Sequence, residues 1–323
     1  MLSKLYELEK KIKDTPIIQL EDEKINLFAK LEYNNLMGSV KIRPAVNIIK
    51  EAIGRGDINE RTVIIESSSG NLAVALALIC ISLDLKFIAV IDKNTNSSTE
   101  ILLQSLAYAV HKIEEPDHTG GYLINRLQKV KELLNHYPNT YWTNQYENHD
   151  NYLSHYYGIG NEIADFFSKL DYIFVGVSSG GTITGVSMRV KEKFPNVKVI
   201  AVDVEGSAIF GTKNKKRNIP GLGSSIVPNV LQYAKIDEVI HITELDIIDG
   251  NDELLKEHFL FAGASSGTVY KAIKNFFQGY TLKDKPNVVF ICPDTGWPYI
   301  DTIYNQEWIG NLLGSEGVLG YGK

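Results

Sequence analysis

The 323-residue sequence contains only two cysteines, Cys80 and Cys292, and each lies in an apolar run. Two isolated cysteines cannot form a disulfide framework or a cysteine-rich metal site, so we expect both to be buried as small hydrophobic side chains. The seven histidines form no HxH, HExxH or histidine–cysteine cluster. The sequence therefore predicts no resident metal ion.

The sequence also lacks an excess of positive charge. Its 33 Lys and Arg residues are outnumbered by 39 Asp and Glu residues, which gives a net charge of −6. This balance argues against nucleic acid or an anionic membrane surface as the main partner. One basic run, 213–217, stands against the average, and we interpret it as a solvated loop. The less favoured alternative is a role at the entrance of a site for an anionic substrate.

Long apolar runs are absent as well. No window approaches the roughly 18 uncharged apolar residues that would span a bilayer, so no membrane segment is predicted. The first ten residues carry charges and lack the apolar centre of a signal peptide. We therefore expect a cytoplasmic protein.

What the sequence does contain is a repeated α/β pattern. A strand, a small-residue loop, a helix and a second strand are predicted within 61–92, and again within 171–203. Each set is a βαβ unit with parallel strands. Two short strands are expected at 14–20 and 26–33; helices are expected at 97–110, 121–135 and 251–258. A chain of this length predicts two domains, each a mainly parallel sheet wrapped by helices.

Three loops rich in glycine and hydroxyl groups follow predicted strands, at 67–71, 178–182 and 293–296. In open α/β sheets, ligands bind beyond the carboxyl ends of strands. The loop at 178–182 suits a single phosphate, because backbone N–H groups, two hydroxyls and a helix N-terminus can converge on an anion. It lacks the lysine of a Walker loop and the GxGxxG spacing of a dinucleotide fold. The loop at 67–71 suits a carboxylate. The alternative for the loop at 178–182 is an ordinary tight turn, and the alternative for the loop at 67–71 is a simple helix cap.

Lys41 stands just before a predicted helix in the segment 38–45. The helix follows from apolar residues at spacings of three and four, and Gly54 could end it. A lysine beside a helix N-terminus meets the positive end of the helix dipole, which is unfavourable. Its position is explained if the amine is committed to an imine with an aldehyde cofactor. A solvated surface lysine is the alternative.

Four motifs occur in one order along the chain: Gly-Ser-x-Lys-x-Arg-Pro-Ala at 38–45, Glu-Ser-Ser-Ser-Gly-Asn at 66–71, Ser-Gly-Gly-Thr-Ile-Thr-Gly at 179–185 and Pro-Asp-Thr-Gly at 293–296. With Thr15-Pro16 and Pro220-Gly-Leu-Gly223, they resemble the fold-type II pyridoxal-phosphate enzymes of the cysteine synthase and cystathionine β-synthase family, which share the tryptophan synthase β-like fold. The resemblance covers nearly the whole chain.

The family resemblance implies pyridoxal 5′-phosphate as cofactor, amino-acid substrates and a homodimer. It implies that Lys41 is the Schiff-base lysine, that Asn71 meets the 3′-oxygen of the cofactor and that Thr295 meets its ring nitrogen. The residues implied for the cofactor phosphate are Ser178, Ser179, Gly180, Gly181 and Thr182. Those implied for the substrate carboxylate are Ser67, Ser68, Ser69 and Gly70. A neutral hydroxyl at the ring nitrogen is typical of β-elimination and β-replacement, whereas an aspartate is typical of transamination.

The resemblance also implies a division of the chain into two domains. Residues 35–150 would form a smaller, mobile substrate-binding domain. Residues 1–34 together with 151–323 would form a larger domain that binds the cofactor.

Within the family, further motifs are similar to the N-(2-amino-2-carboxyethyl)-L-glutamate synthases of siderophore-type 2,3-diaminopropionate biosynthesis. These motifs are Glu114-Glu-Pro-Asp, Gly120-Gly-Tyr-Leu, Arg126, the segment 141–146 and Ser154-His-Tyr-x-Gly158. The resemblance implies O-phospho-L-serine as first substrate and L-glutamate as nucleophile. Arg126 would bind the substrate phosphate, with Tyr146 and Ser179 helping to hold the substrates. For Arg126 the alternative is a solvated helix arginine. For the whole protein the alternatives are a cysteine synthase that uses sulfide and a catalytically idle relative with a binding or regulatory role.

Several positions depart from the family pattern. Where the family usually has Asn-Pro-Gly-Gly-Ser before the lysine, this chain has Asn34-Asn35-Leu36-Met37-Gly38-Ser39. Ile42 replaces an expected acidic residue, and Ser178 replaces the first glycine of the phosphate loop. His258-Phe259 and Trp297-Pro298 also differ from the usual residues. These departures bear on the identity of the nucleophile more than on the cofactor.

Overall fold

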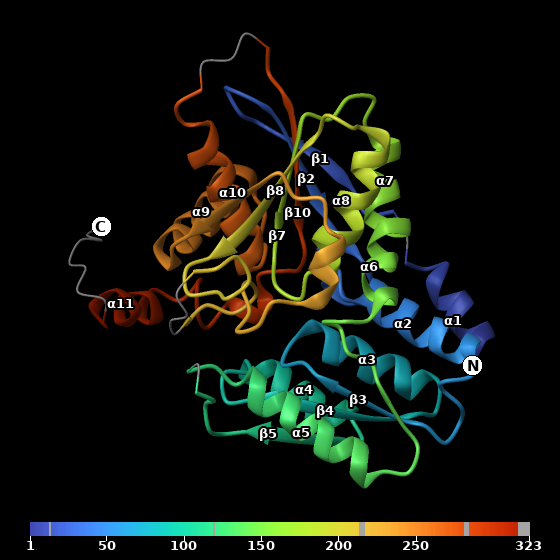
Figure 1. Cartoon of the computed structure of the whole chain (residues 1–323). Coiled ribbons are helices and arrows are strands. Elements are labelled where there is room, and N and C mark those ends of the chain that lie inside the picture. The colour runs from blue at the N-terminus through green and yellow to red at the C-terminus, as the bar shows by residue number, and fades with distance from the viewer. Residues whose placement is uncertain (13, 119, 213–216, 281–283, 316–323) are drawn as a thin grey trace.

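The computed structural model describes the whole chain except residues 13, 119, 213–216, 281–283 and 316–323. Lys213 to Lys216 of the basic run therefore lie outside the described residues. The strands form two separate sheets, and Figure 1 shows the smaller one with its helices in the lower part of the molecule. The fold class predicted from the sequence is confirmed: mainly parallel sheets are flanked by helices.

The larger sheet has six strands in the order β1-β2-β10-β7-β8-β9. Every neighbouring pair is parallel except β1 and β2, which form an antiparallel hairpin. The bounds are β1 Ile17–Leu20, β2 Asn26–Leu31, β10 Asn287–Cys292, β7 Tyr172–Gly176, β8 Lys198–Val204 and β9 Glu238–Ile242. The covering helices are α6 His149–His155, α7 Asn161–Phe166, α8 Gly181–Lys193, α9 Glu244–His258, α10 Ala264–Phe277 and α11 Gln306–Ser315, with a π-helix over Tyr156–Gly160.

The smaller sheet has four parallel strands in the order β5-β4-β3-β6. Its strands are β5 Ala109–Ile113, β4 Lys86–Asp92, β3 Val63–Ser67 and β6 Thr140–Trp142, and its helices are α3 Asn71–Ser82, α4 Ser97–Leu106 and α5 Leu123–His136. Strand β3 is buried along its whole length, which explains its continuous Val-Ile-Ile run. All four strands lie between residues 63 and 142, inside the range predicted for the smaller domain.

Helix α2 (Ile42–Arg55) packs against both α3 and α6, and α1 (Leu2–Glu9) packs against α2. The apolar face of α2 supplies Ile42, Ala45, Val46, Ile49 and Ala52 to the core that surrounds α3. Because α2 contacts helices of both sheets, its N-terminus at Lys41 and Ile42 lies between the two sheets. Both cysteines are buried and free, as the sequence predicts. No described helix combines the length and the apolar character of a membrane-spanning segment.

Three boundaries predicted from the sequence are wrong. The helix expected over 97–110 ends at Leu106, because Ala109–Ile113 pairs in parallel with β4 as an edge strand. Helix α2 does not end at Gly54 but runs to Arg55, and Gly56 caps it with a φ of +84°. Helix α9 begins at Glu244, not at 251, since the side chain of Thr243 accepts a hydrogen bond from the N–H of Asp246.

Candidate active site

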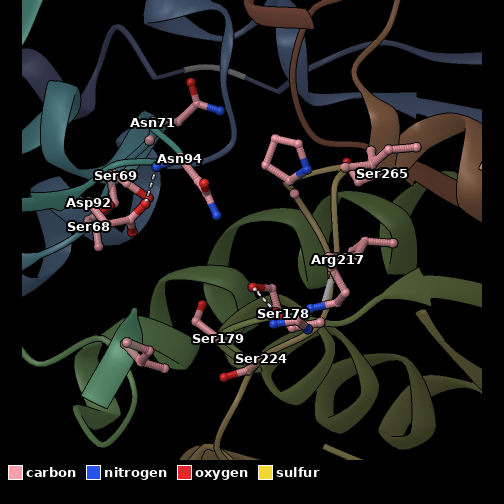
Figure 2. Close-up of a pocket in the computed structure, with 18 of the residues that line it drawn as sticks. Ser68, Ser69, Asn71, Asp92, Asn94, Ser178, Ser179, Arg217, Ser224 and Ser265 are labelled. Carbon is pink, nitrogen blue, oxygen red and sulfur yellow. Dashed lines mark hydrogen bonds between the residues drawn. The ribbon is translucent and has the colours of Figure 1, made fainter. Parts of the chain in front are cut away.

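A cavity of about 580 Å³ opens between the carboxyl ends of the two sheets. This volume is within the roughly 300–1,000 Å³ typical of small-molecule sites. Figure 2 shows Ser68, Ser69 and Asp92 on one side of the cavity, with Ser178, Ser179, Ser224 and Arg217 on the other. The residues predicted from the sequence that line it are Lys41, Ser67, Ser68, Ser69, Gly70, Asn71, Arg126, Tyr146, Ser178, Ser179, Gly180 and Thr182. Gly181 and Thr295 do not line it.

Lys41 is the N-cap residue of α2, and its backbone N–H donates to Oγ of Ser39. Its Nζ donates to Oγ of Ser179 in the loop at 178–182, at 3.3 Å. Burial lowers the pKa of the Lys41 amine to about 8, against the opposing attraction of Asp294 and Glu66. An amine with this pKa is partly neutral near physiological pH, so it can act as a nucleophile and as a base.

The turn before Lys41 explains one departure from the family pattern. Met37, which stands where the family usually has a glycine, adopts a φ of +67°, and Gly38 follows with +64°. Both angles lie in the left-handed region that favours glycine. The chain therefore keeps the backbone shape of a two-glycine turn while placing a methionine, 39% exposed, in a strained conformation.

The phosphate loop joins β7 to α8 and presents the unpaired N–H groups of the α8 N-terminus to the cavity. Gly180 has a φ of +80°, and a Cβ at this position would lie 2.9 Å from Cγ of Leu231. Only glycine fits both restrictions. Gly181 faces away from the cavity, since a Cβ there would collide with the side chain of Asn151. Its contribution to the loop is close packing of α8 on its neighbour α6.

The serine loop follows β3 and opens α3. Behind it lies Glu66, which is fully buried and accepts hydrogen bonds from the N–H of Ser67, the hydroxyl of Thr143 and the N–H of Gln145. Burial raises the pKa of the Glu66 carboxyl to about 7, although these hydrogen bonds oppose the rise. Glu66 thus ties the serine loop to the segment 143–145, which leads to Tyr146 on the cavity wall.

Arg126 projects from α5 and is only 9% exposed, so it is not a solvated helix arginine. Its Nη1 donates to Oγ of Ser69 at 3.2 Å, and its Nε lies 3.3 Å from Oδ2 of Asp92. The structure therefore brings a guanidinium to the serine loop. Burial raises the pKa of the nearby Tyr146 hydroxyl, which stays protonated at neutral pH.

Ser265 and Asp294 are among the residues that line the cavity and that the sequence reasoning did not select. Thr295 instead forms a bridge with Ala262, and its Cγ2 lies against the Gly38 turn. Ser265, at the start of α10, brings a neutral hydroxyl of the kind expected from Thr295. The glycine–serine pattern at 263–267 was visible in the sequence, but it follows an isolated bridge residue and not a recognisable strand.

Asp294 is buried, and its Oδ2 accepts hydrogen bonds from Nδ2 of Asn71 at 2.7 Å and from the hydroxyl of Tyr299 at 2.9 Å. Burial raises the pKa of this carboxyl to about 6. The Asn71 amide carries two N–H groups, so one remains for another acceptor. Asp294 joins the end of β10 to the start of α3 and thereby connects the two halves of the cavity.

This set of groups fits pyridoxal phosphate. The buried Lys41, with its lowered pKa, can form the imine, and the loop at the N-terminus of α8, which requires Gly180, can hold the phosphate. The amide of Asn71 and the neutral hydroxyl of Ser265 are available for the ring. The phosphate loop and Lys41 approach one another within hydrogen-bond distance, through Ser179.

Comparisons with known proteins agree with this fit. A family model described as pyridoxal-phosphate dependent enzyme matches residues 8–294. An O-acetylserine dependent cystathionine beta-synthase from Helicobacter pylori is similar, with 30% identity, a TM-score of 0.84, and 92% of this chain and 98% of that chain covered.

Two further solved structures are also similar to the chain. A hydrogen sulfide-producing enzyme from Fusobacterium nucleatum has 27% identity and a TM-score of 0.83, covering 90% of this chain and 98% of that chain. An O-ureido-L-serine synthase has 25% identity and a TM-score of 0.84, covering 94% and 98% respectively.

Proposed function

The chain belongs to the family of pyridoxal-phosphate-dependent enzymes, and from that premise we propose that it replaces the phosphate of O-phospho-L-serine with the amine of L-glutamate. The Cβ–O bond of phosphoserine breaks, a bond forms between Cβ and the glutamate nitrogen, and the amine loses a proton. The products are N-(2-amino-2-carboxyethyl)-L-glutamate and phosphate. Such a product is a precursor of 2,3-diaminopropionate, as in siderophore biosynthesis.

The observation that carries the proposal is the position of Arg126. Its guanidinium is hydrogen-bonded to Ser69 of the serine loop and lines the same cavity as Lys41. An amino acid whose carboxylate lies on the serine loop would extend its Cβ substituent into the space beside this loop. A planar, permanently charged guanidinium there favours a leaving group with phosphate charge over a neutral ester.

Each group then has a role in the reaction. The bound cofactor supplies an electron sink for the substrate Cα. Nζ of Lys41 removes the Cα proton and later returns it. Ser67, Ser68, Ser69 and Gly70 would hold the substrate carboxylate, while Ser178, Ser179, Gly180 and Thr182 would hold the cofactor phosphate. Asn71 would donate to the 3′-oxygen of the cofactor, and Ser265 would take the place at the ring nitrogen that the sequence assigned to Thr295.

The domain division belongs to the same proposal. Binding of a carboxylate at the serine loop would draw residues 35–150 toward the remainder of the chain, residues 1–34 and 151–323. Closure excludes water, which would otherwise compete with the amine for the activated Cβ. We also propose a homodimer, on the basis of the family resemblance.

Phosphate release from O-phospho-L-serine tests the proposal. We expect the holoenzyme to release phosphate rapidly only when glutamate is present. A cysteine synthase is the second candidate, supported by the similarity to enzymes named for O-acetylserine and hydrogen sulfide. Much faster phosphate release with sulfide than with glutamate would favour that candidate and contradict the glutamate assignment.

Replacement of Arg126 separates the leaving group from the nucleophile. Arg126→Ala should raise KM for O-phosphoserine by about 10- to 100-fold, since a hydrogen-bonded charge contributes roughly 1.5–3 kcal/mol, and should change O-acetylserine kinetics little. Lys129→Ala is the matched control on the same helix, because Lys129 pairs with Glu132 on the outer face. Equal losses with both substrates would refute the phosphate-binding role.

A further inference from the structure

Arg217 lines the cavity on the side opposite the serine loop (Figure 2). It is the last residue of the basic run 213–217 and the first of the segment that ends in the Pro220-Gly-Leu-Gly223 motif. Neither the cofactor nor the first substrate, as assigned above, uses it. The described basic side chains that line the cavity are Lys41, Arg126 and Arg217.

The Pro220–Gly223 motif makes room for this guanidinium. Gly223 has a φ of +74°, and a Cβ there would collide with Nη1 of Arg217. The N–H of Gly223 donates to the carbonyl of Val177 at 2.9 Å, and its own carbonyl accepts from Oγ of Ser178 at 3.2 Å. Arg217 is therefore held in place beside the phosphate loop by a backbone that is itself fixed.

The guanidinium retains hydrogen-bonding capacity. Nη1 of Arg217 is buried and has no hydrogen-bond partner among the described residues. Asp203 and Glu244 attract the charge. However, Glu244 already accepts hydrogen bonds from the backbone N–H and the side-chain amide of Asn218 and from the backbone N–H of Ile219. Oδ2 of Asp203 is likewise unpartnered, so it is not bonded to this nitrogen.

The other two cations are already engaged. Arg126 pairs with Asp92 and donates to Ser69 through Nη1, although its Nε, like Nη1 of Arg217, has no hydrogen-bond partner among the described residues. Lys41 donates to Ser179 and is attracted by Asp294 and Glu66. An unpaired buried N–H costs free energy unless a ligand satisfies it. Arg217 thus brings a second guanidinium to the cavity wall, separate from that of Arg126, with its Nη1 packed on Gly223.

We infer that Arg217 binds the side-chain carboxylate of the second substrate, and therefore that the amine donor is a dicarboxylic amino acid. This inference rests on the proposed function and specifies which end of the nucleophile is recognised. With the side-chain carboxylate on Arg217, the amine is left free to approach Cβ of the first substrate. The competing assignment is that Arg217 binds the cofactor phosphate, because it lies beside the loop at 178–182.

The test compares glutamate with glutamine, which lacks only the side-chain charge. In Arg217→Gln holoenzyme we expect kcat/KM for glutamate to fall about 10- to 100-fold, while kcat/KM for glutamine changes less than about threefold. Cofactor affinity and KM for O-phosphoserine should stay unchanged. Arg217→Lys should retain part of the preference for glutamate. Arg61→Gln is the matched control, because Arg61 is an exposed arginine outside the cavity.

Equal losses with glutamate and glutamine, or weakened cofactor binding, would overturn the inference. Inhibition of the wild type by glutarate gives a readout that needs no variant: it should compete with the amine donor far better than glutaramate does, and equal inhibition would contradict the role of Arg217. Wild-type rates with glutamate, aspartate and sulfide separate the two claims. Turnover with aspartate but not glutamate would refute the proposed function and support the inference, whereas rejection of both dicarboxylic amino acids in favour of sulfide would overturn both.

Discussion

At the scale of single residues, the position of Lys41 destabilises its charged amine and thereby lowers its pKa. As the N-cap of α2 it meets the positive end of the helix dipole, and its burial adds a desolvation cost. Both effects disfavour the charged amine, while Asp294 and Glu66 oppose them. The resulting pKa of about 8 makes the neutral amine accessible at physiological pH.

This pKa predicts how the apoprotein takes up its cofactor. The neutral amine is the reactive form, so the rate of cofactor attachment should rise about tenfold per pH unit below pH 8 and flatten above it. Stopped-flow absorbance after addition of pyridoxal phosphate would measure the rate between pH 6 and 10. Lys41→Ala should show no visible absorbance from attached cofactor. A rate that still rises steeply from pH 9 to 10 would contradict the lowered pKa.

The residues that converge on the cavity were largely predictable because each lies in a short motif with its own chemistry. The serine loop and the loop at 178–182 could be selected from residue type and position after a strand, and Lys41 from its position before a helix. Ser265 and Asp294 could not, since their place in the cavity depends on how α10 and β10 pack together. Thr295 was selected as the hydroxyl of its motif, yet only the three-dimensional fold shows that its neighbour Asp294 faces the cavity.

At the scale of elements, α2 is fixed by a buried ionic network. Arg43 contacts Glu32 through Nε at 2.7 Å and Glu162 through Nη1 at 2.6 Å, and Lys30 also pairs with Glu162. The hydroxyl of Thr15 donates to Glu32, which gives the Thr15-Pro16 motif a structural role. The network connects β2, α2 and α7, and it places Lys41 at a defined point between the sheets.

Removal of Arg43 should therefore be costly. Arg43→Met leaves Glu32 and Glu162 buried with one cation between them, and we expect a loss of about 3–5 kcal/mol in stability. Arg55→Met is the control on the same helix. Arg55 pairs with Asp57 and Asp150 but is 48% exposed, so its loss should cost about 0–1 kcal/mol. Thermal unfolding would measure both; similar shifts for the two variants would contradict the account.

The phosphate loop gives a second prediction at this scale. Gly180→Ala forces a left-handed backbone on a residue with a Cβ and a contact of 2.9 Å with Leu231. Since the left-handed conformation costs roughly 1–2 kcal/mol, cofactor affinity should fall at least about tenfold. Gly54→Ala provides the control, because this helical position has open surroundings. Cofactor titration followed by absorbance would measure the change, and an unaltered dissociation constant for Gly180→Ala would refute the role of the loop.

Element types were easier to predict than their ends. Buried strands such as β3 and β4 carry long apolar, β-branched runs that few helices would show. The edge strand β5 is short and half-buried, so its sequence alone did not separate it from the preceding helix. The end of α2 depended on which of two glycines, Gly54 or Gly56, takes a positive φ. Gly56 does so, and its N–H donates to the carbonyls of Ala52 and Ile53 and closes the helix.

At the scale of the whole molecule, the cavity lies between two separate sheets. We predict that residues 35–150 close over a bound amino acid. Small-angle X-ray scattering of the holoenzyme should show a smaller radius of gyration with O-phosphoserine, at unchanged molecular mass. Sulfate at equal ionic strength is the control. An unchanged radius of gyration at saturating substrate would contradict the mobile-domain assignment.

The most direct test of the central claim is the mass of the product. Holoenzyme supplied with O-phospho-L-serine and ¹⁵N-labelled L-glutamate should form N-(2-amino-2-carboxyethyl)-L-glutamate that retains the label, with one phosphate released for each molecule formed. Mass spectrometry would identify it directly. Release of phosphate with only pyruvate and ammonia as products, or formation of cysteine from added sulfide in place of the labelled product, would contradict the claim.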